Sequence, residues 1–237
     1  MHDASILITV FNCDEYIEQS VASALSQTIE DFEVIVVDDG STDRTAQMLD
    51  RIEDRRLKTF HCPRIGRARA LNFGLERCAS PYVAILDADD IAFPRRLRLQ
   101  ADFLSNNPDI VLVGSKFRTF IDADGRLTGR ENLLPTESRE ILVMLKAMKY
   151  PLAHSSIMFR KEAVRELGGY DENLPCYGDL DLYVRAASNF KFANIGERLS
   201  LKRLHPKQFF GGPAGLLHTP AGLKAREIVA RRAAALA

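Results

Sequence analysis

Short apolar runs alternate with segments of helical periodicity along the first half of the chain. The first two runs, residues 5–11 (SILITVF) and 32–37 (FEVIVV), are nearly continuous, as expected of strands that are buried on both faces. The alternation continues with predicted helices near 17–25, 42–52, 70–75 and 94–105, and with predicted strands at 57–60, 82–86 and 110–117. This order of elements predicts an α/β fold, a mostly parallel sheet covered by helices.

The pattern is less regular in the second half of the chain. It predicts a hairpin turn at 122–125 (DADG), strands at 154–159 (HSSIMF), 191–195 and 199–204, and helices at 137–148 and 179–188. Gly168 and Gly169 are expected to end a further short helix. The tail from Gly211 is rich in Gly and Pro and then in Ala and Arg, which is typical of a helix or of an arm that packs on a neighbour.

Composition excludes several classes of protein. With 46% hydrophobic residues, 27% charged residues and a net charge of zero, the chain is neither disordered nor basic enough to indicate a nucleic-acid partner. Its four cysteines lack C-x-x-C spacing, which favours a reducing compartment over a zinc site or a disulfide framework. No signal peptide or membrane span is recognised, so we expect a cytoplasmic protein, with peripheral contact at the inner face of the membrane left open.

Carboxylates follow two of the predicted strands, in DDGS (38–41) and in DADD (87–90). Ligands of an open parallel sheet bind outside the carboxyl ends of its strands, and carboxylates gathered there repel one another unless a cation or donor groups offset the repulsion. Oxygen ligands suit Mg²⁺ or Mn²⁺. Turn and helix-cap roles are the alternative for Asp39 or Asp90 alone, but a cap needs one carboxylate and DADD supplies three.

Several ordered motifs resemble the family 2 glycosyltransferases of GT-A fold. The resemblance runs from Ser5 to Pro206 through SILITVFNCDEYIEQSVASALSQTIEDFEVIVVDDGSTDRT, GRARALNFGL, VAILDADDIAFPRRL, HSSIMFRKEAVRELGGYDE, GDLDLYVRAA and LSLKRLHP. It implies a single GT-A (Rossmann-like) domain over residues 1–210, with a nucleotide-sugar-binding half (1–117), an acceptor-binding and catalytic half (118–210), and a tail at 211–237 that is predicted to be helical.

The same resemblance implies where a nucleotide-sugar donor binds. In such enzymes the end of the first strand and the DDGS loop hold the nucleotide, which here places Thr9 and Phe11 near the base and Asp39 at the uracil-type ring or the ribose. Positive charge from Arg67 or Arg69 is expected to face the diphosphate, with a solvated helix face as the alternative role of either arginine.

Asp87 and Asp89 form the D-x-D of the family, which implies Mn²⁺ or Mg²⁺ with Asp89 as the direct ligand and Asp87 nearer the ribose. Asp90 is then expected to support the loop. His205 ends the segment that matches the R-x-H pattern of the family and is expected at the metal or the diphosphate, although a histidine before proline in a loop is otherwise unremarkable. His154 is expected to be a hydrogen-bonded core residue.

The family takes its general base from an E-D motif that opens a late helix, and the aligned residues are Gly178 and Asp179. Asp179 is therefore the expected base, and its alternative role is an N-cap of that helix. The missing glutamate at Gly178 weakens what can be inferred about the acceptor. Asp181, two residues further on, is expected to be structural because it points to another side of the helix.

Together these features predict an inverting, metal-dependent glycosyltransferase. The donor is expected to be a UDP- or dTDP-sugar and the acceptor a glycan or a lipid-linked molecule, in cell-surface polysaccharide or glycolipid synthesis. One alternative is a sugar-nucleotide pyrophosphorylase-like nucleotidyltransferase, although residues 8–13 (ITVFNC) lack its Gly-rich basic loop. The other is a nucleotide-sugar-binding protein without turnover, against which the retention of Asp179 argues.

Overall fold

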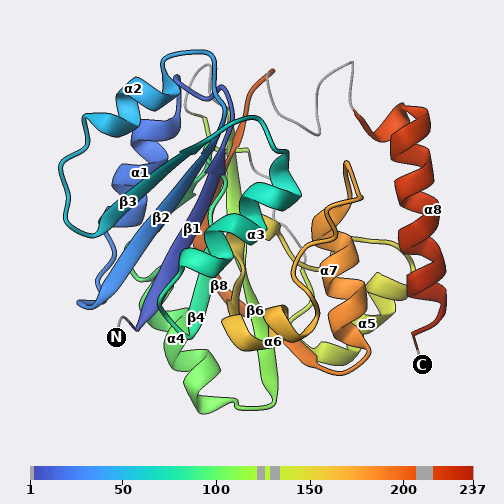
Figure 1. Cartoon of the computed structure of the whole chain (residues 1–237). Helices are drawn as coiled ribbons and strands as arrows, with labels where there is room; N and C mark the ends of the chain where they lie inside the picture. Colours follow the sequence, from blue (N-terminus) through green and yellow to red (C-terminus); the bar gives the residue numbers. More distant parts are fainter. Residues whose placement is uncertain (1–2, 122–125, 129–133, 207–215, 237) are drawn as a thin grey trace.

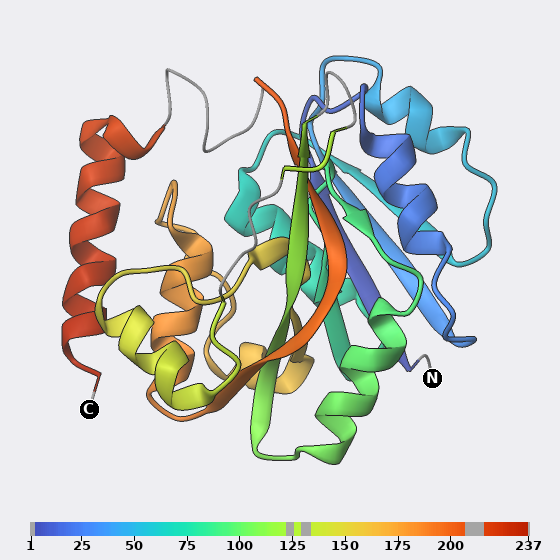
Figure 2. The ribbon, with the colours of Figure 1, turned by 180° about the vertical axis from the view of Figure 1, so that it is seen from behind.

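The computed structural model describes residues 3–121, 126–128, 134–206 and 216–236, which form one curled sheet with helices on both faces (Figures 1 and 2). The strand order is β3-β2-β1-β4-β7-β6-β8-β5. In chain order the strands are β1 (Ala4–Val10), β2 (Phe32–Asp39), β3 (Leu57–Cys62), β4 (Tyr82–Ile85), β5 (Ile91–Ala92), β6 (Ile110–Ile121), β7 (Met158–Arg160) and β8 (Lys191–Leu204).

Most neighbouring strands run parallel, as the alternation of elements predicted. β3, β2, β1 and β4 are paired in parallel, and so are β6 and β8. β7 runs antiparallel between β4 and β6, and the short β5 pairs antiparallel with β8. The carboxyl ends of β1, β2 and β4 therefore meet at one edge of the sheet, where the residues that follow them gather.

The continuous apolar runs arise because both faces of the sheet are covered. In β1, Leu7 belongs to the core on one face, whereas Ile6 and Ile8 belong to the core on the other. The first core is closed by α3 (Arg67–Arg77), α5 (Ser138–Lys146), α6 (Lys161–Glu166), α7 (Gly178–Ala187) and α8 (Pro220–Ala234), and the second by α1 (Ile17–Leu25), α2 (Thr45–Asp50) and α4 (Arg96–Asn106). Among the described residues, no helix has the length and apolar character needed to cross a membrane.

Four local predictions need correction. Residues 154–156 form a 3-10 helix (η1, His154–Ser156) before β7, because the hydroxyl and the N–H of Ser156 both turn back to the Ala153 carbonyl. The strands predicted at 191–195 and 199–204 are one strand, β8, in which a bulge absorbs the polar residues between them. α4 begins two residues after Pro94, and α2 begins at Thr45, not at residue 42.

Two further predictions concern the hairpin turn after β6 and the C-terminal tail. The hairpin turn predicted at 122–125 lies outside the described residues, although Phe120 on one side of it bridges Leu127 on the other in antiparallel fashion. In the tail, a second 3-10 helix (η2, Leu216–His218) precedes α8, which packs on α7 and α5 of its own chain through buried Ala225, Val229 and Ala233.

A buried arginine at the start of α4 ties β4 to the η1 segment. The Arg96 side chain is fully buried and donates to the carbonyls of Ser155, Ile85 and Ile157 at 2.7–3.0 Å. Burial lowers the pKa of Arg96 to about 10, although the charges of Asp90 and Asp87 act in the opposite direction. Arg96 thus holds in place the strand end from which the DADD loop departs.

Replacing Arg96 with methionine is expected to lower the free energy of unfolding by ~3 kcal/mol or more, because three buried carbonyls each lose a donor at a cost of ~1–3 kcal/mol. Urea unfolding followed by circular dichroism measures this change. Arg98→Met, at an exposed position of the same helix, is the matched control and should change stability by less than ~0.5 kcal/mol. Equal effects of the two substitutions would contradict the assigned role.

Candidate functional site

Two cavities open at the carboxyl ends of the parallel strands. The first, of about 420 Å³, is lined by Thr9, Phe11, Asp39, Asp89 and His205 among others and is called here the β1 cavity. The second, of about 770 Å³, is lined by His154, Tyr170 and Asp179 among others and is called the α7 cavity. Both are lined by Arg64, Arg67 and Asp87, so these three residues stand where the cavities meet.

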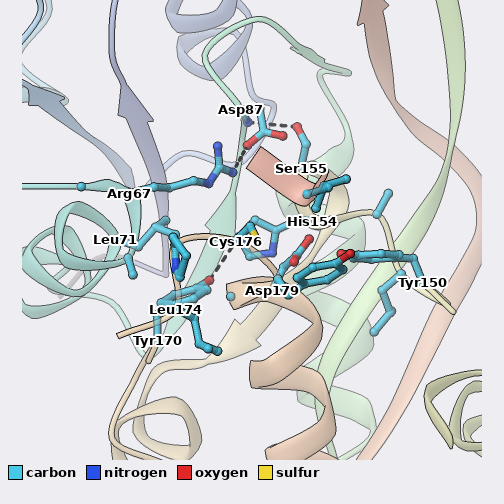
Figure 3. Close-up of a pocket in the computed structure, with 18 of the residues that line it drawn as sticks. Arg67, Leu71, Asp87, Tyr150, His154, Ser155, Tyr170, Leu174, Cys176 and Asp179 are labelled. Atoms are coloured by element: carbon cyan, nitrogen blue, oxygen red, sulfur yellow. Dashed lines mark hydrogen bonds and ion pairs between the residues drawn. The ribbon is translucent and has the colours of Figure 1, made fainter. Parts of the chain in front are cut away.

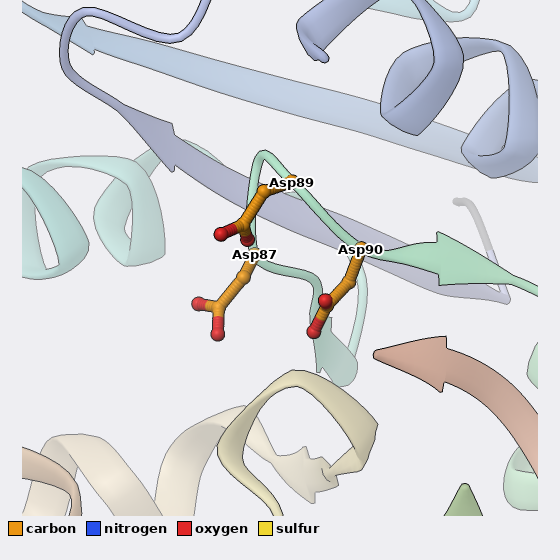
Figure 4. Close-up of side chains that lie close together, drawn as sticks. All are labelled: Asp87, Asp89 and Asp90. Carbon is orange, nitrogen blue, oxygen red and sulfur yellow. The ribbon is translucent and has the colours of Figure 1, made fainter. Parts of the chain in front are cut away.

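The DADD loop brings three carboxylates together, as Figure 4 shows. One carboxylate oxygen from each of Asp87, Asp89 and Asp90 lies within 4.8 Å of the others. Asp90 is buried and accepts the main-chain N–H of Arg203 at 3.0 Å, which fits the predicted supporting role in the loop. Burial and the neighbouring charges of Asp87 and Asp89 raise the pKa of Asp90 well above its ordinary value.

Asp87 forms an ion pair with Arg67. Nη2 of Arg67 lies 2.5 Å from Oδ1 of Asp87 (Figure 3). Burial works to raise the pKa of Asp87, but the Arg67 guanidinium outweighs burial and brings that pKa below its ordinary value. The main-chain N–H of Asp87 donates to Ser155 Oγ at 3.0 Å. The Asp87 carboxylate is thus held ionised and fixed at the junction of the two cavities.

Asp89 meets a histidine that lies 116 positions away in the chain. Its Oδ2 is 2.9 Å from Nε2 of His205, whose side chain is 4% exposed. Among the described residues, Nδ1 of this histidine has no hydrogen-bond partner, and its ring packs against Tyr16 with centroids 4.5 Å apart. Clustered carboxylate oxygens with one imidazole nitrogen form a donor set that fits Mn²⁺ or Mg²⁺, so these residues suit the predicted ion.

Asp39 lines the β1 cavity and is bonded to residues 64–66, the loop between β3 and α3. The buried Asp39 carboxylate accepts the N–H groups of Ile65 and Gly66 at 2.6 and 3.0 Å and pairs with Arg64. Gly40, with φ +74°, permits this close approach, since a Cβ there would lie 2.6 Å from the Arg64 nitrogen. The predicted nucleotide-binding carboxylate is therefore already engaged by its own chain.

Arg64 lines both cavities and was not predicted from the sequence. Its guanidinium carbon lies 3.6 Å from the ring centroid of Phe11, which is 41% exposed at the end of β1. Thr9, two residues before Phe11, also lines the β1 cavity. Arg64 precedes α3 in an irregular loop, where no periodicity indicates the direction of a side chain.

The two arginines predicted for the diphosphate have different positions. Arg67, in the first turn of α3, reaches Asp87 and lines both cavities, and the charges of Asp87 and Asp179 raise its pKa against the opposing effect of burial. Of the two cavities, Arg69 lines only the α7 cavity. It pairs with Glu172 at 3.2 Å, and 58% of the Arg69 side chain is exposed. The geometry favours Arg67 for a ligand that spans both cavities.

Asp179 lies in the first turn of α7 at the wall of the α7 cavity (Figure 3). Tyr177, with φ +63°, occupies the N-cap position, so Asp179 is not the N-cap residue itself. Its carboxylate nevertheless accepts an N–H of the first turn, that of Leu180, at 2.8 Å. A Cβ added to Gly178 would meet no atom within 4 Å, so the chain leaves open space at the position where the resemblance implies a glutamate.

Three buried side chains near Asp179, those of His154, Tyr170 and Tyr183, are joined by hydrogen bonds. His154 Nδ1 is 2.9 Å from the Tyr183 hydroxyl, and its Nε2 is 3.3 Å from the Tyr170 hydroxyl. Burial lowers the pKa of His154, which keeps the imidazole neutral in spite of the nearby charge of Asp179. His154 is hydrogen-bonded and buried as expected, but it also lines the α7 cavity, together with the unpredicted Ser155 and Lys202.

A family model described as "Glycosyl transferase family 2" matches residues 5–168. The chain is 31% identical to the amylovoran biosynthesis glycosyltransferase AmsE of Erwinia amylovora, over 78% of this chain and 69% of that protein. It is 29% identical to the O-antigen biosynthesis glycosyltransferase WbnJ of Escherichia coli, over 86% of this chain and 80% of that protein.

The fold has a solved counterpart in the crystal structure of S. aureus TarS 1-349 in complex with UDP-GlcNAc. The TM-score is 0.78 at 18% identity, and the match covers 97% of this chain and 66% of that one. Against three uncharacterized bacterial glycosyltransferases of 28–31% identity, this chain spans 28%, 66% and 64% of the length of the relative.

Proposed function

The chain belongs to glycosyl transferase family 2, and from this membership we propose that it is an inverting, metal-dependent glycosyltransferase that moves a sugar from a UDP- or dTDP-linked donor to an acceptor hydroxyl. One observation carries the proposal. Asp87 and Asp89 of the carboxylate cluster line the β1 cavity and Asp179 lines the α7 cavity, and the two cavities meet at the ion pair of Arg67 and Asp87. A donor with its diphosphate at this junction places its sugar before Asp179.

The nucleotide is assigned to the β1 cavity. Phe11 and Arg64 present a flat aromatic and guanidinium surface suited to a base, and Thr9 and Asp39 lie beside it. Asp89 and His205 would hold Mn²⁺ or Mg²⁺, an ion that when bound offsets negative charge on the diphosphate. TarS, with the same fold, has been crystallised with UDP-GlcNAc, which supports a nucleotide-sugar as the donor.

The chemistry assigned to the residues of this chain is simple. As the bond to the diphosphate breaks, charge grows on the leaving oxygen, and Arg67 at the junction of the cavities stabilises that charge. On the opposite side of the sugar, the carboxylate of Asp179 takes the proton of the attacking acceptor hydroxyl. Attack from the side opposite the leaving group inverts the configuration at the anomeric carbon.

The acceptor is assigned to the α7 cavity, whose wall includes Tyr150, Tyr177 and the open space beside Gly178. A glycan or a lipid-linked acceptor fits its mixed apolar and polar lining. The names of AmsE and WbnJ support a role in cell-surface polysaccharide or glycolipid synthesis. Because a charged nucleotide-sugar does not cross a bilayer unaided, we place the reaction in the cytoplasm, at the inner face of the membrane where the acceptor is lipid-linked.

Thermal unfolding with nucleotides tests the donor site. UDP, UDP-GlcNAc, dTDP, GDP and CDP are compared with Mn²⁺ and with EDTA. A uridine or thymidine diphosphate with Mn²⁺, at 100 times its Kd, is expected to raise Tm by about 5–10 °C, since such saturation is worth ~2.7 kcal/mol and each kcal/mol shifts Tm by ~2–4 °C. Shifts that are absent, or equal with EDTA, would contradict a metal-assisted donor site.

Donor hydrolysis separates the enzyme from a non-catalytic nucleotide-sugar-binding protein. The enzyme is expected to release UDP slowly from UDP-GlcNAc, or from the donor that the thermal screen identifies, when water replaces the acceptor. A binding protein would show the thermal shift without any nucleotide release. The match to the family argues against the pyrophosphorylase-like alternative.

A further inference from the structure

The charged side chain of Asp181, two residues after Asp179 in α7, is buried. Asp181 is 0% exposed, and burial of an unpaired carboxylate at such a position is costly. Its Oδ2 accepts Arg185 Nε from the next turn of the same helix at 2.8 Å. Its Oδ1 accepts Arg232 Nη1, which comes from α8. The first turn of α7 is therefore anchored through a buried carboxylate to the C-terminal helix.

The same arginine reaches a second segment of the α7 cavity. Nη2 of Arg232 donates to Asp171 Oδ2 at 3.0 Å. The neighbours of Asp171 in the chain are Tyr170, whose hydroxyl meets His154, and Glu172, which pairs with Arg69 at the rim. One guanidinium thus links the helix that carries the expected base to the loop that forms the facing wall of the cavity.

Packing holds the arginine in place. α8 buries Ala225, Val229 and Ala233 against the rest of the chain, and it lies beyond residues 5–168, which match the family. Burial acts to lower the pKa of Arg232, but the hydrogen bonds that it donates to Asp181 and Asp171 raise it, so the side chain stays charged. A planar guanidinium can satisfy two carboxylates at once in a fixed geometry, whereas an ammonium acts as a single point charge.

We propose that Arg232 is a positioning residue for sugar transfer, which holds the first turn of α7 and the 170–172 loop at a fixed separation by bridging Asp181 and Asp171. The proposal rests on the proposed function in one respect, the role of Asp179 as base. A base that shifts by about 1 Å loses up to ~10²-fold in rate, although the ligand-binding residues elsewhere are unchanged. The effect of losing Arg232 is therefore expected in turnover and not in nucleotide affinity.

The kinetic test compares Arg232→Met, Arg232→Lys and the control Arg231→Met, at least 10 °C below each Tm. Arg231 is the adjacent residue of α8, 82% exposed, with only a 3.8 Å contact to Glu227. For UDP-GlcNAc hydrolysis, or hydrolysis of the donor identified above, Arg232→Met should lower kcat about 10-fold or more with KM and the UDP Kd within twofold. Arg232→Lys should recover part of the loss, and Arg231→Met should match the parent.

A parent-like kcat in folded Arg232→Met, or a loss of UDP affinity in step with kcat, would overturn the proposal. If Arg232→Met does not fold, Asp171→Asn is tested in its place. This change removes one of the two carboxylates that Arg232 bridges and leaves its pair with the buried Asp181 intact. A parent-like kcat in Asp171→Asn, or a loss of UDP affinity in step with kcat, would likewise overturn the proposal.

Hydrogen exchange gives a readout that does not depend on turnover. Amides of residues 178–182 and 170–173 should exchange about 10-fold faster in Arg232→Met than in Arg231→Met, because the link between the two segments is lost. Equal exchange in the two variants would overturn the proposal. If the parent protein releases no nucleotide from any donor, the proposed function fails, and the exchange result still decides whether Arg232 holds α7.

Discussion

Replacing Asp179 with asparagine is expected to lower sugar transfer and donor hydrolysis by ~10²–10⁴-fold, the usual contribution of a general base. The asparagine amide retains the size of the side chain and can still accept the N–H of Leu180, so the first turn of α7 should persist. UDP affinity should stay within about twofold, because Asp179 lines only the α7 cavity. Initial rates of UDP release and isothermal titration with UDP and Mn²⁺ measure the two quantities.

Asp109→Asn is the matched control for Asp179→Asn. Asp109 is an exposed carboxylate that pairs with Lys191 and lines neither cavity, so its replacement should leave both the rate and the affinity unchanged. A parent-like rate in Asp179→Asn would show that the acceptor proton is taken by another group. A loss of UDP affinity as large as the loss of rate would show instead that the substitution disturbs the donor site.

Replacing Asp89 with asparagine is expected to remove the Mn²⁺ dependence of nucleotide binding. Asp89 offers a carboxylate oxygen that lies 2.9 Å from His205 Nε2, and an amide is a much poorer ligand for a hard divalent ion. The UDP Kd of the variant in Mn²⁺ should therefore rise to the value that the parent shows in EDTA, and turnover should fall by ~10²-fold or more, since charge on the leaving diphosphate is no longer offset.

Isothermal titration with UDP, in Mn²⁺ and in EDTA, provides the comparison and its own control. In EDTA the parent and Asp89→Asn should bind UDP equally, which shows that the rest of the β1 cavity is intact. His205→Ala should reduce the Mn²⁺ effect in the same direction. An undiminished Mn²⁺ enhancement in Asp89→Asn would place the ion on other ligands.

The parallel half of the fold could be predicted because its sequence signal is local. Residues 5–11 and 32–37 are nearly continuous apolar runs, as expected of strands covered on both faces, and the helical spacing between them leaves a parallel crossover as the simple connection. The position of the DADD and DDGS loops at one edge of the sheet follows from this topology. Asp39 of the DDGS loop and Asp87 and Asp89 of the DADD loop accordingly line one cavity.

Which side chains pair with one another in the site could not be predicted from the sequence. Arg67 and Arg69 are two positions apart on a helix and so face different directions, but the sequence does not say which one faces the junction of the cavities. Packing of α3 on β1 and β2 turns Arg67 towards Asp87 and leaves Arg69 with Glu172. Arg64 and Tyr170, one of the two partners of His154, lie in irregular loops, for which no periodicity exists.

By itself, the sequence determined the alternating strands and helices of the parallel half, the residues that follow those strands, and which carboxylates and cations are present for the chemistry. These properties depend on short stretches of chain and on repeats of two or 3.6 residues. Only the tertiary structure decided that His205 meets Asp89 from 116 positions away and that Arg232 of α8 joins Asp181 to Asp171. Such contacts form when buried charges must find partners during packing, and the identity of the partner depends on the whole fold.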